Sequence, residues 1–283
     1  SLLTLSGVSG GTNSYSYQWQ SSPNGSSWTN ISGATGTTYT PTSVMATTYF
    51  RVMVTSNGAM AATNGSLVTV YPQLLGGSVT PAAPSINYNT SPGTLTVSSP
   101  SGGNGTYSSQ WQSSPDGNTW TNISGATATS YAAPTLTTTT YYRVLVSSNG
   151  VQSGGNSAKV TVYPQLAGGS ATPASLNINY NTAPGVLSLT GVSGGSGTNT
   201  YQWQSSSNGS SWTNVSGATA NTYTPTALTV RTYYQCVVSS NGVSVTGNST
   251  TINVYPQLLA GSITPGGRRI AYDESTGAMT LNG

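Results

Sequence analysis

Residue types that usually carry catalytic chemistry are scarce in this sequence of 283 residues. It contains no histidine, and its three acidic residues are Asp116, Asp273 and Glu274. General acid–base and nucleophilic catalysis need positioned acids, bases or activated nucleophiles. Without histidine, no Ser–His arrangement can form. We therefore expect no catalytic residue and no enzymatic activity in this segment.

Asp273 and Glu274 are adjacent and could contribute ligands to a calcium site. Two carboxylates fall short of the six to eight oxygen ligands that Ca²⁺ takes, so we interpret the pair as part of a solvated loop. Asp116 lies at a turn position that holds Asn24 and Asn208 in two related segments, which indicates turn chemistry. The sequence predicts no metal site and no cofactor.

The low charge of the chain excludes several partners. Lysine and arginine together number 6, and the net charge is +3, too little for the basic footprint of a nucleic-acid-binding protein. We interpret Arg268 and Arg269 as protection of a strand edge against further pairing. The single Cys236 excludes an intrachain disulfide framework. We expect a buried thiol that packs as a small hydrophobe; the alternative is a reactive or intermolecular thiol.

Two recurring aromatic sets could bind a ligand by stacking on sugar rings. The sets are Trp28, Trp120 and Trp212, and Tyr39, Tyr131 and Tyr223. Such rings in a β-sandwich are more often half-buried at the edge of the core. We favour the core interpretation because the rings recur in every repeat, as core positions would. No ligand-binding residue is assigned, and any glycan or protein ligand is unknown.

The tryptophans point to the element around which the chain is organised, the stretch 107–123. It predicts a β-hairpin whose first strand carries Trp111 inward and whose second strand carries Trp120 and Ile123. Pro-Asp-Gly forms the turn, with glycine supplying the positive φ that tight turns need. The corresponding pairs Trp19/Trp28 and Trp203/Trp212 are each displaced by 92 residues, since 111 − 19 and 203 − 111 both equal 92.

The same period of 92 runs through the whole chain and defines its domains. Tyr-Pro-Gln-Leu occurs at 71–74, 163–166 and 255–258. We predict one domain per period: 1–72 as a first repeat whose opening strand lies outside the sequence, 73–164, 165–256, and 257–283 as the first strands of a fourth repeat. The sequence contains no signal peptide and no long apolar run. We expect it to be a segment of a longer protein, without membrane insertion in this part.

Seven short strand patterns fill the middle repeat, and no helical periodicity of useful length appears. The first pattern, 78–88, is broken by Pro81 and Pro84, which predicts an edge strand that can switch sheets. The others are 94–98, the two hairpin strands, 129–132, 141–147 and 159–163. This number of strands with a tryptophan on the third predicts an all-β fold of tandem immunoglobulin-like, seven-stranded Greek-key sandwiches in an elongated array.

The joint between successive repeats is short and partly apolar. In residues 71–77, Pro72 restricts the backbone, and we expect Leu74 and Leu75 to pack between domains and Gly76-Gly77 to bend the chain. Such a joint favours a semi-rigid string of domains.

Three sequence runs recur through the repeats: Tyr-Gln-Trp-Gln-Ser-Ser, Trp-Thr-Asn-Ile-Ser-Gly-Ala-Thr and Thr-Tyr-Tyr-Arg-Val. In these runs the repeats resemble the tandem Ig-like repeats of very large Bacteroidetes cell-surface and adhesin-type proteins, and the resemblance covers essentially the whole chain. It implies export and a location on the outer cell surface.

Three functions follow as hypotheses. The first is a structural, non-catalytic stalk, filament or adhesin shaft, whose partners are the neighbouring repeats and, through polar faces such as Gln18/Gln20 and Gln110/Gln112, other copies in lateral fibres. The second is a glycan- or protein-binding module, which predicts one repeat with a divergent loop cluster. The third is a spacer of a surface enzyme or toxin whose active domain lies outside this segment.

Overall fold

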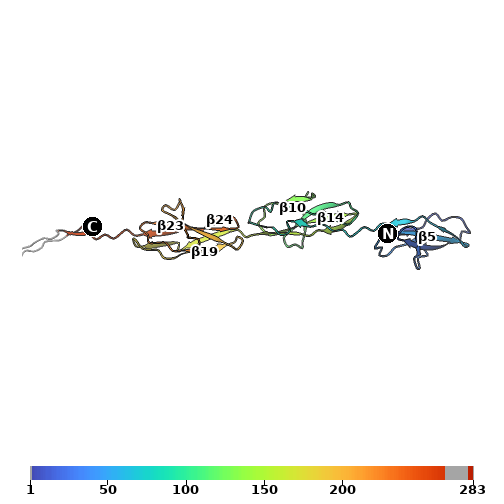
Figure 1. Cartoon of the computed structure of the whole chain (residues 1–283), viewed down its shortest axis with the longest axis horizontal. Helices are drawn as coiled ribbons and strands as arrows, with labels where there is room; N and C mark the ends of the chain where they lie inside the picture. The colour runs from blue at the N-terminus through green and yellow to red at the C-terminus, as the bar shows by residue number, and fades with distance from the viewer. Residues whose placement is uncertain (1, 265–279, 283) are drawn as a thin grey trace, which may run out of the picture. The chain divides into compact units, whose positions relative to one another are not determined.

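The computed structural model describes residues 2–264 and 280–282, and every regular element in these residues is a β-strand (Figure 1). The chain divides into two compact units. The first comprises Ser1–Ala82, Thr94–Tyr131 and Tyr141–Ala158, and the second comprises Ala83–Gly93, Ala132–Thr140 and Lys159–Gly283. The boundary passes through the second repeat.

The repeats contain short strands at equivalent positions. The strands of the first repeat are β1 Leu3–Thr4, β2 Ser16–Ser22, β3 Thr29–Asn30, β4 Thr38–Tyr39, β5 Thr48–Ser56, β6 Ala59–Ala62 and β7 Ser66–Val68. Those of the second are β8 Val79–Thr80, β9 Ser85–Ile86, β10 Thr94–Val97, β11 Ser108–Ser114, β12 Thr121–Asn122, β13 Ser130–Ala132, β14 Thr140–Ser148, β15 Val151–Gly154 and β16 Ala158–Val162. Those of the third are β17 Ala167–Thr172, β18 Ser175–Ile178, β19 Leu187–Ser193, β20 Thr200–Ser206, β21 Thr213–Asn214, β22 Thr222–Tyr223, β23 Thr232–Ser240, β24 Val243–Thr246 and β25 Thr250–Val254. Two further strands are β26 Ser262–Thr264 and β27 Thr280–Asn282.

The predicted hairpin is confirmed. β11 pairs antiparallel with β12, with Gln112 opposite Asn122, and Gly117 in the turn has a φ of 76°. Trp111 is fully buried, and its indole N–H donates to the Ala128 carbonyl at 2.8 Å. The large ring thus enters the core with its polar atom satisfied. Truncating such a ring in a core costs about 3–5 kcal/mol.

Each complete repeat forms two sheets. In the second repeat the strand orders are β13-β10-β8 and β12-β11-β14-β16-β9, with β15 added to β14. β8 pairs antiparallel with β10, whereas β9 pairs in parallel with β16. The opening strand therefore changes sheets between Pro81 and Pro84, as predicted. The tandem Ig-like sandwich fold is confirmed by this arrangement and by its repetition in the third repeat.

The third repeat has the strand orders β17-β19-β22 and β18-β25-β23-β20-β21, and β24 pairs with β23 (Figure 1). Its core is built on Trp203, Leu187, Val238 and Ile252, which are all fully buried. In the first repeat the core is smaller and consists of Trp19, Phe50 and Val52.

The seven predicted strands correspond to nine segments for two reasons. The opening strand is split into β8 and β9, and one further strand, β15, precedes the closing strand β16. β15 was not predicted as a strand. It follows a tight turn in which Asn149 and Gly150 have φ values of 48° and 78°, and Asn-Gly is itself a strong signal for a hairpin.

Some expectations concern residues outside those described. The protective role of Arg268 and Arg269 and the loop of Asp273 and Glu274 fall there. Within the described residues, no helix has the length and apolar character required to cross a membrane.

Candidate functional site

Asp116 is the one acidic side chain in the part of the chain that the structure describes. Its Oδ1 accepts hydrogen bonds from the backbone N–H groups of Thr119 and Asn118 and from the Ser114 hydroxyl, each at 2.8 Å. These bonds lower the pKa of Asp116 to about 2, and the bond from the Thr119 N–H has the largest effect. Across residues 2–264 and 280–282, no cluster of three or more His, Cys, Asp or Glu could hold a metal ion. Asp116 therefore organises a turn, as predicted.

Cys236 is fully buried in the core of the third repeat, opposite Trp203 and among Leu187 and Leu189. Burial raises the pKa of its thiol, which reduces the population of the reactive thiolate. The predicted packing role is confirmed.

The tyrosine set lies against the core. Tyr131 packs between Trp111 and Tyr142, with ring centroids 5.7 and 5.8 Å away. Tyr39 and Tyr223 make the equivalent contacts in the other repeats. Half-buried rings packed on both sides serve the sandwich, as the core interpretation predicted.

The outer tryptophans belong to a ladder of polar side chains on the sheet that contains β11 and β14. The Arg143 guanidinium carbon lies 4.3 Å from the Trp120 ring centroid. Arg143 Nε donates to Gln112 Oε1 at 2.8 Å, and Gln112 Nε2 donates to Asn122 Oδ1 at 2.8 Å. Because the guanidinium covers a face of this half-buried ring, that face is not free for a sugar.

The ladder is repeated with one change. In the first repeat, Arg51 lies 4.3 Å from the Trp28 ring centroid. In the third repeat Gln235 takes the place of arginine and donates to Gln204 Oε1 at 2.8 Å. The outer glutamines of all three repeats use their amides within their own domain. The sequence prediction of lateral contacts through these glutamines does not account for these intradomain bonds.

The second and third repeats each bind the segment that leads into them. We call residues 72–80 the linker strand of the second repeat, and the slot between residues 97–103 and 154–156 its linker groove. Gly103 N donates to the Pro72 carbonyl at 2.9 Å. Leu75 and Ser101 exchange two backbone hydrogen bonds, of 2.9 and 3.1 Å. Leu74 inserts its side chain and is only 6% exposed.

Glycines let the two backbones approach closely in this groove. A Cβ added to Gly76 would lie 2.5 Å from the Gly155 nitrogen, and one added to Gly155 would lie 2.5 Å from the Gly77 carbonyl oxygen. A Cβ on Gly102 would overlap the Gln73 carbonyl oxygen. The contact therefore accepts almost no side chain, which is one of the situations that require glycine.

The third repeat holds its linker strand, residues 164–172, in the same way. Gly195 N donates to the Pro164 carbonyl at 2.9 Å, and Leu166 is 8% exposed. Here a second contact spans the joint. Asn87 Nδ2 donates to the Asn241 carbonyl and Asn241 Nδ2 donates to Asn87 Oδ1, both at 3.0 Å. The joint is thus fixed by side chains of both flanking repeats.

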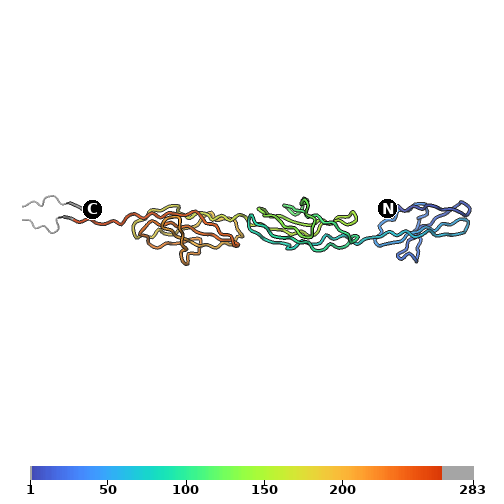
Figure 2. The backbone as a smooth tube through the Cα atoms, turned by 90° about the horizontal axis from the view of Figure 1, so that it is seen from above, coloured from blue at the N-terminus to red at the C-terminus, as the bar shows by residue number. Residues whose placement is uncertain are grey.

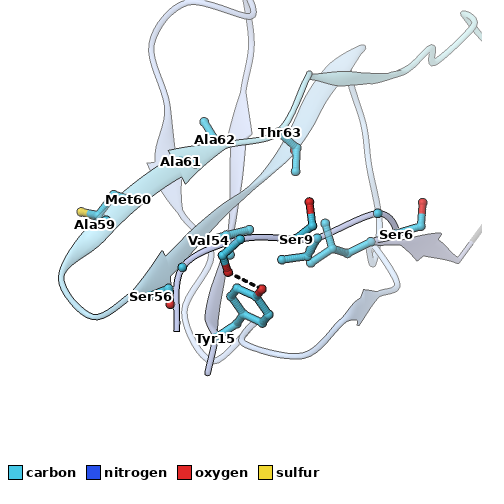
Figure 3. A pocket seen from close by; sticks show the side chains of 15 residues that line it. Ser6, Ser9, Tyr15, Val54, Ser56, Ala59, Met60, Ala61, Ala62 and Thr63 are labelled. Carbon is cyan, nitrogen blue, oxygen red and sulfur yellow. Dashed lines mark hydrogen bonds between the residues drawn. The ribbon is translucent and has the colours of Figure 1, made fainter. Parts of the chain in front are cut away.

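The linker groove of the first repeat is open. It is a cavity of about 320 Å³ that extends from Leu5 to Gly11 on one side and from Ala59 to Thr63 on the other (Figure 3). Among the described residues, no strand lies in it. Tyr15 closes one end, and its hydroxyl donates to the Gly10 carbonyl at 2.5 Å. It corresponds to the groove that holds the linker strand in the second and third repeats.

The sequence prediction for the joint was partly right. Leu74 packs as expected, but Leu75 is 55% exposed, so the prediction that both leucines pack is wrong. Gly76-Gly77 was interpreted as a bend, whereas its main role is close backbone contact. The overlooked signal was the matching glycine at Gly155, which faces the linker.

A protein-family model with the description Domain of unknown function (DUF8696) matches residues 1–72, 76–164 and 167–256. No curated protein matches the chain. Solved structures with a similar fold include the N-terminal four Ig domains of Dscam1 isoform 6.9 (14% identity, 74% of this chain and 54% of that chain, TM-score 0.34). Another is the structure of titin domains A168–A170, with 13% identity, coverage of 84% of this chain and 88% of that chain, and a TM-score of 0.41. A third is the structure of the chicken CNTN1 FN1–FN3 domains, with 14% identity, coverage of 84% of this chain and 88% of that chain, and a TM-score of 0.31. The chain spans about half to two-thirds of the length of the Dscam1 structures.

Proposed function

The chain belongs to the family described as Domain of unknown function (DUF8696), and from that premise we propose that it is a structural, non-catalytic segment of a long extracellular surface protein. In this proposal the repeats form a semi-rigid stalk, filament or adhesin shaft. The domains are residues 1–72, 73–164, 165–256 and 257–283, and their partners are the neighbouring repeats.

The observation that carries the proposal is the docked linker strand. A joint made of backbone hydrogen bonds, a buried leucine and close glycine contacts restricts rotation far more than a flexible connection would. The Asn87–Asn241 amide pair adds a further constraint at the joint between the second and third repeats. A shaft needs such joints, whereas a set of independent binding domains does not.

Location and source are also proposed. The surface is rich in Ser, Thr, Asn and Gly, and charged residues make up 3% of the chain, a composition consistent with export. The resemblance to Bacteroidetes surface repeats supports the same location. Lateral assembly into fibres stays a proposal without support from the outer glutamines, whose amides bond within their own domain.

Small-angle X-ray scattering on the 283-residue chain tests the proposal. A shaft should advance by about 35–45 Å per repeat, from strands of about ten residues at ~3.3 Å each plus the joint. The Asn87→Ala variant should broaden the distribution of distances, because the amide pair is lost. A chain whose repeats tumble independently, with or without this substitution, would contradict the proposal.

Two other functions stay open as proposals. A glycan- or protein-binding module would need an accessible site, and the covered face of Trp120 offers no support for stacking there. A spacer of a surface enzyme or toxin would share the shaft described above, and the sequence that flanks this segment in its parent distinguishes the two.

A further inference from the structure

We propose that Asn241 is a site of spontaneous deamidation that the joint between the second and third repeats protects, and that its conversion to an acidic residue releases this joint. The modification consumes only water and needs no enzyme. The inference rests on the contact between these two repeats, which is also part of the proposed shaft. Because the product cannot form that contact again, the change at the joint is irreversible.

Asn241 is followed by Gly242 in the two-residue turn between β23 and β24. Asparagine deamidates most readily before glycine, which has no side chain to shield its backbone nitrogen. The Gly242 nitrogen attacks Asn241 Cγ, the Cγ–Nδ2 bond breaks, and Nδ2 leaves as ammonia with the proton that the Gly242 nitrogen gives up. Water then opens the resulting cyclic imide to aspartate or isoaspartate.

The side chain of Asn241 is held by a reciprocal pair of amide hydrogen bonds, which we call the clasp. Asn241 Nδ2 donates to Asn87 Oδ1, and Asn87 Nδ2 donates to the Asn241 carbonyl, both at 3.0 Å. The tip of the β23–β24 hairpin, in orange, lies at the end of the third sandwich where the linker strand enters (Figure 2). Attack requires the planar amide of Asn241 to turn towards the Gly242 nitrogen and become tetrahedral. The clasp opposes both changes, because it holds Nδ2 against Asn87.

The second repeat contains the same turn without the clasp. Ser-Ser-Asn-Gly-Val occurs at both 147–151 and 239–243. The φ values of the Asn-Gly pair are 48° and 78° in both turns, and both pairs are exposed. In the part of the chain that the structure describes, the Asn149 side chain forms no hydrogen bond. The two turns thus share their sequence and backbone conformation and differ in the clasp.

The product of deamidation cannot restore the clasp. An ionised aspartate accepts hydrogen bonds and donates none, so the side chain and the carbonyl of residue 241 would both present acceptors to Asn87. The amide of Asn87 has one oxygen and one nitrogen, and a single nitrogen cannot occupy both places. In either orientation of this amide, one acceptor faces another. Isoaspartate further inserts a methylene group into the backbone of the turn.

Peptide mapping by mass spectrometry tests the protection on the whole folded chain, aged near neutral pH. Trypsin releases residues 144–159 and 232–268 as separate peptides, and each carries one Asn-Gly pair. Two exposed hydrogen bonds should make Asn241 deamidate about 5- to 30-fold more slowly than Asn149. In denaturant, where the clasp is absent, the two identical sequences should deamidate at the same rate.

Asn87→Ala should raise the deamidation rate of Asn241 to that of Asn149, because it removes both bonds of the clasp and leaves the turn intact. Asn179→Ala is the matched control, since Asn179 lies one period of 92 after Asn87 and is exposed. It should leave both rates unchanged. Equal rates at Asn241 and Asn149 in the unchanged folded chain, or an Asn241 rate that Asn87→Ala does not alter, would overturn the proposal.

Asn241→Asp reproduces one product and tests the release of the joint. In small-angle X-ray scattering it should broaden the distribution of distances as much as Asn87→Ala does. The variant with both substitutions should be no broader, because each removes the same clasp. Asn149→Asp is the control in the unclasped turn and should leave the distribution unchanged. An Asn241→Asp chain with joints as restricted as those of the unchanged chain would refute the release.

The two proposals fail in different ways. Restricted joints together with equal deamidation rates at Asn241 and Asn149 would overturn the protection and leave the shaft function standing. Repeats that tumble independently in the unmodified chain would instead contradict the shaft.

Discussion

Gly155→Ala is the sharpest test of the linker contact. The added methyl group would lie 2.5 Å from the Gly77 carbonyl oxygen and 2.7 Å from that of Gly76, closer than Cβ atoms approach oxygen in proteins. The backbone of Gly155 is not in the left-handed region, so alanine suits the local conformation. The cost therefore arises from the linker strand, which must move away.

The size of the effect follows from the bonds that this movement breaks. Asn156 N donates to the Gly77 carbonyl at 2.9 Å, and Val79 N donates to the Asn156 carbonyl at 3.3 Å. A backbone hydrogen bond contributes about 0.5–1.5 kcal/mol, so the free energy of opening the linker should fall by about 1–3 kcal/mol. This corresponds to faster amide exchange by about 5- to 150-fold.

Hydrogen exchange followed by mass spectrometry on the whole chain gives the required local measurement. Residues 75–80 should exchange faster in the variant, while the hairpin of residues 107–123 should not change. Gly36→Ala is the matched control, because the nearest atom to its added methyl, the Thr38 carbonyl oxygen, lies 3.4 Å away. Unchanged exchange in residues 75–80 of the Gly155→Ala chain would refute the close contact.

Three further predictions concern side chains. Asp116 has a pKa of about 2 in the folded protein, against an ordinary value of 3.8, so its stabilisation of the turn is present above pH 3.8 and is lost as the pH falls through 2. Asp116→Asn should abolish this acid transition in the NMR amide signals of the turn. A transition that persists in the variant would contradict the assignment to Asp116. Burial raises the pKa of Tyr142 from 10.0 to about 12, so its contribution to the stability of the second repeat is complete below pH 10 and is lost as the pH rises through 12. Tyr142→Phe, which places in the second repeat the residue that the first repeat has at Phe50, should shift the alkaline unfolding of the second repeat to higher pH, measured by circular dichroism. An unshifted curve would argue against this role of Tyr142. Gln235→Arg should place a guanidinium over Trp212 and stabilise the third repeat by about 0.5–1 kcal/mol, measured by thermal unfolding. Unaltered stability together with unaltered tryptophan fluorescence would show that no stacking forms.

The sandwich could be predicted because its signals are local and repeated. Trp111, the Pro-Asp-Gly turn and the alternation along β14 each specify part of a strand, and the period shows that the parts recur. The switch of the opening strand between sheets was also predictable, because Pro81 and Pro84 remove backbone donors from the middle of a strand pattern.

The groove could not be predicted in the same way, because it depends on residues distant in sequence. Gly76 and Gly155 have meaning only as a pair, and nothing local distinguishes a glycine needed for backbone approach from one in a turn. The cover that Arg143 provides over Trp120 likewise depends on the pairing of β11 with β14. The sequence suggests only a connection between domains, whereas the structure shows that the linker is also a strand of the following domain.

The docked linker supplies a physical reason for the constant period of 92. The chain passes from β16 directly into a linker strand whose Leu166 must enter the third repeat, while Ala167 pairs with Ser193. Because side chains alternate across a strand, one inserted residue would turn Leu166 to the opposite face and shift every following pair. The joint therefore tolerates no change in length, unlike a loop that only connects domains. The strict period thus records the structural contact made at the joints that lead into the second and third repeats.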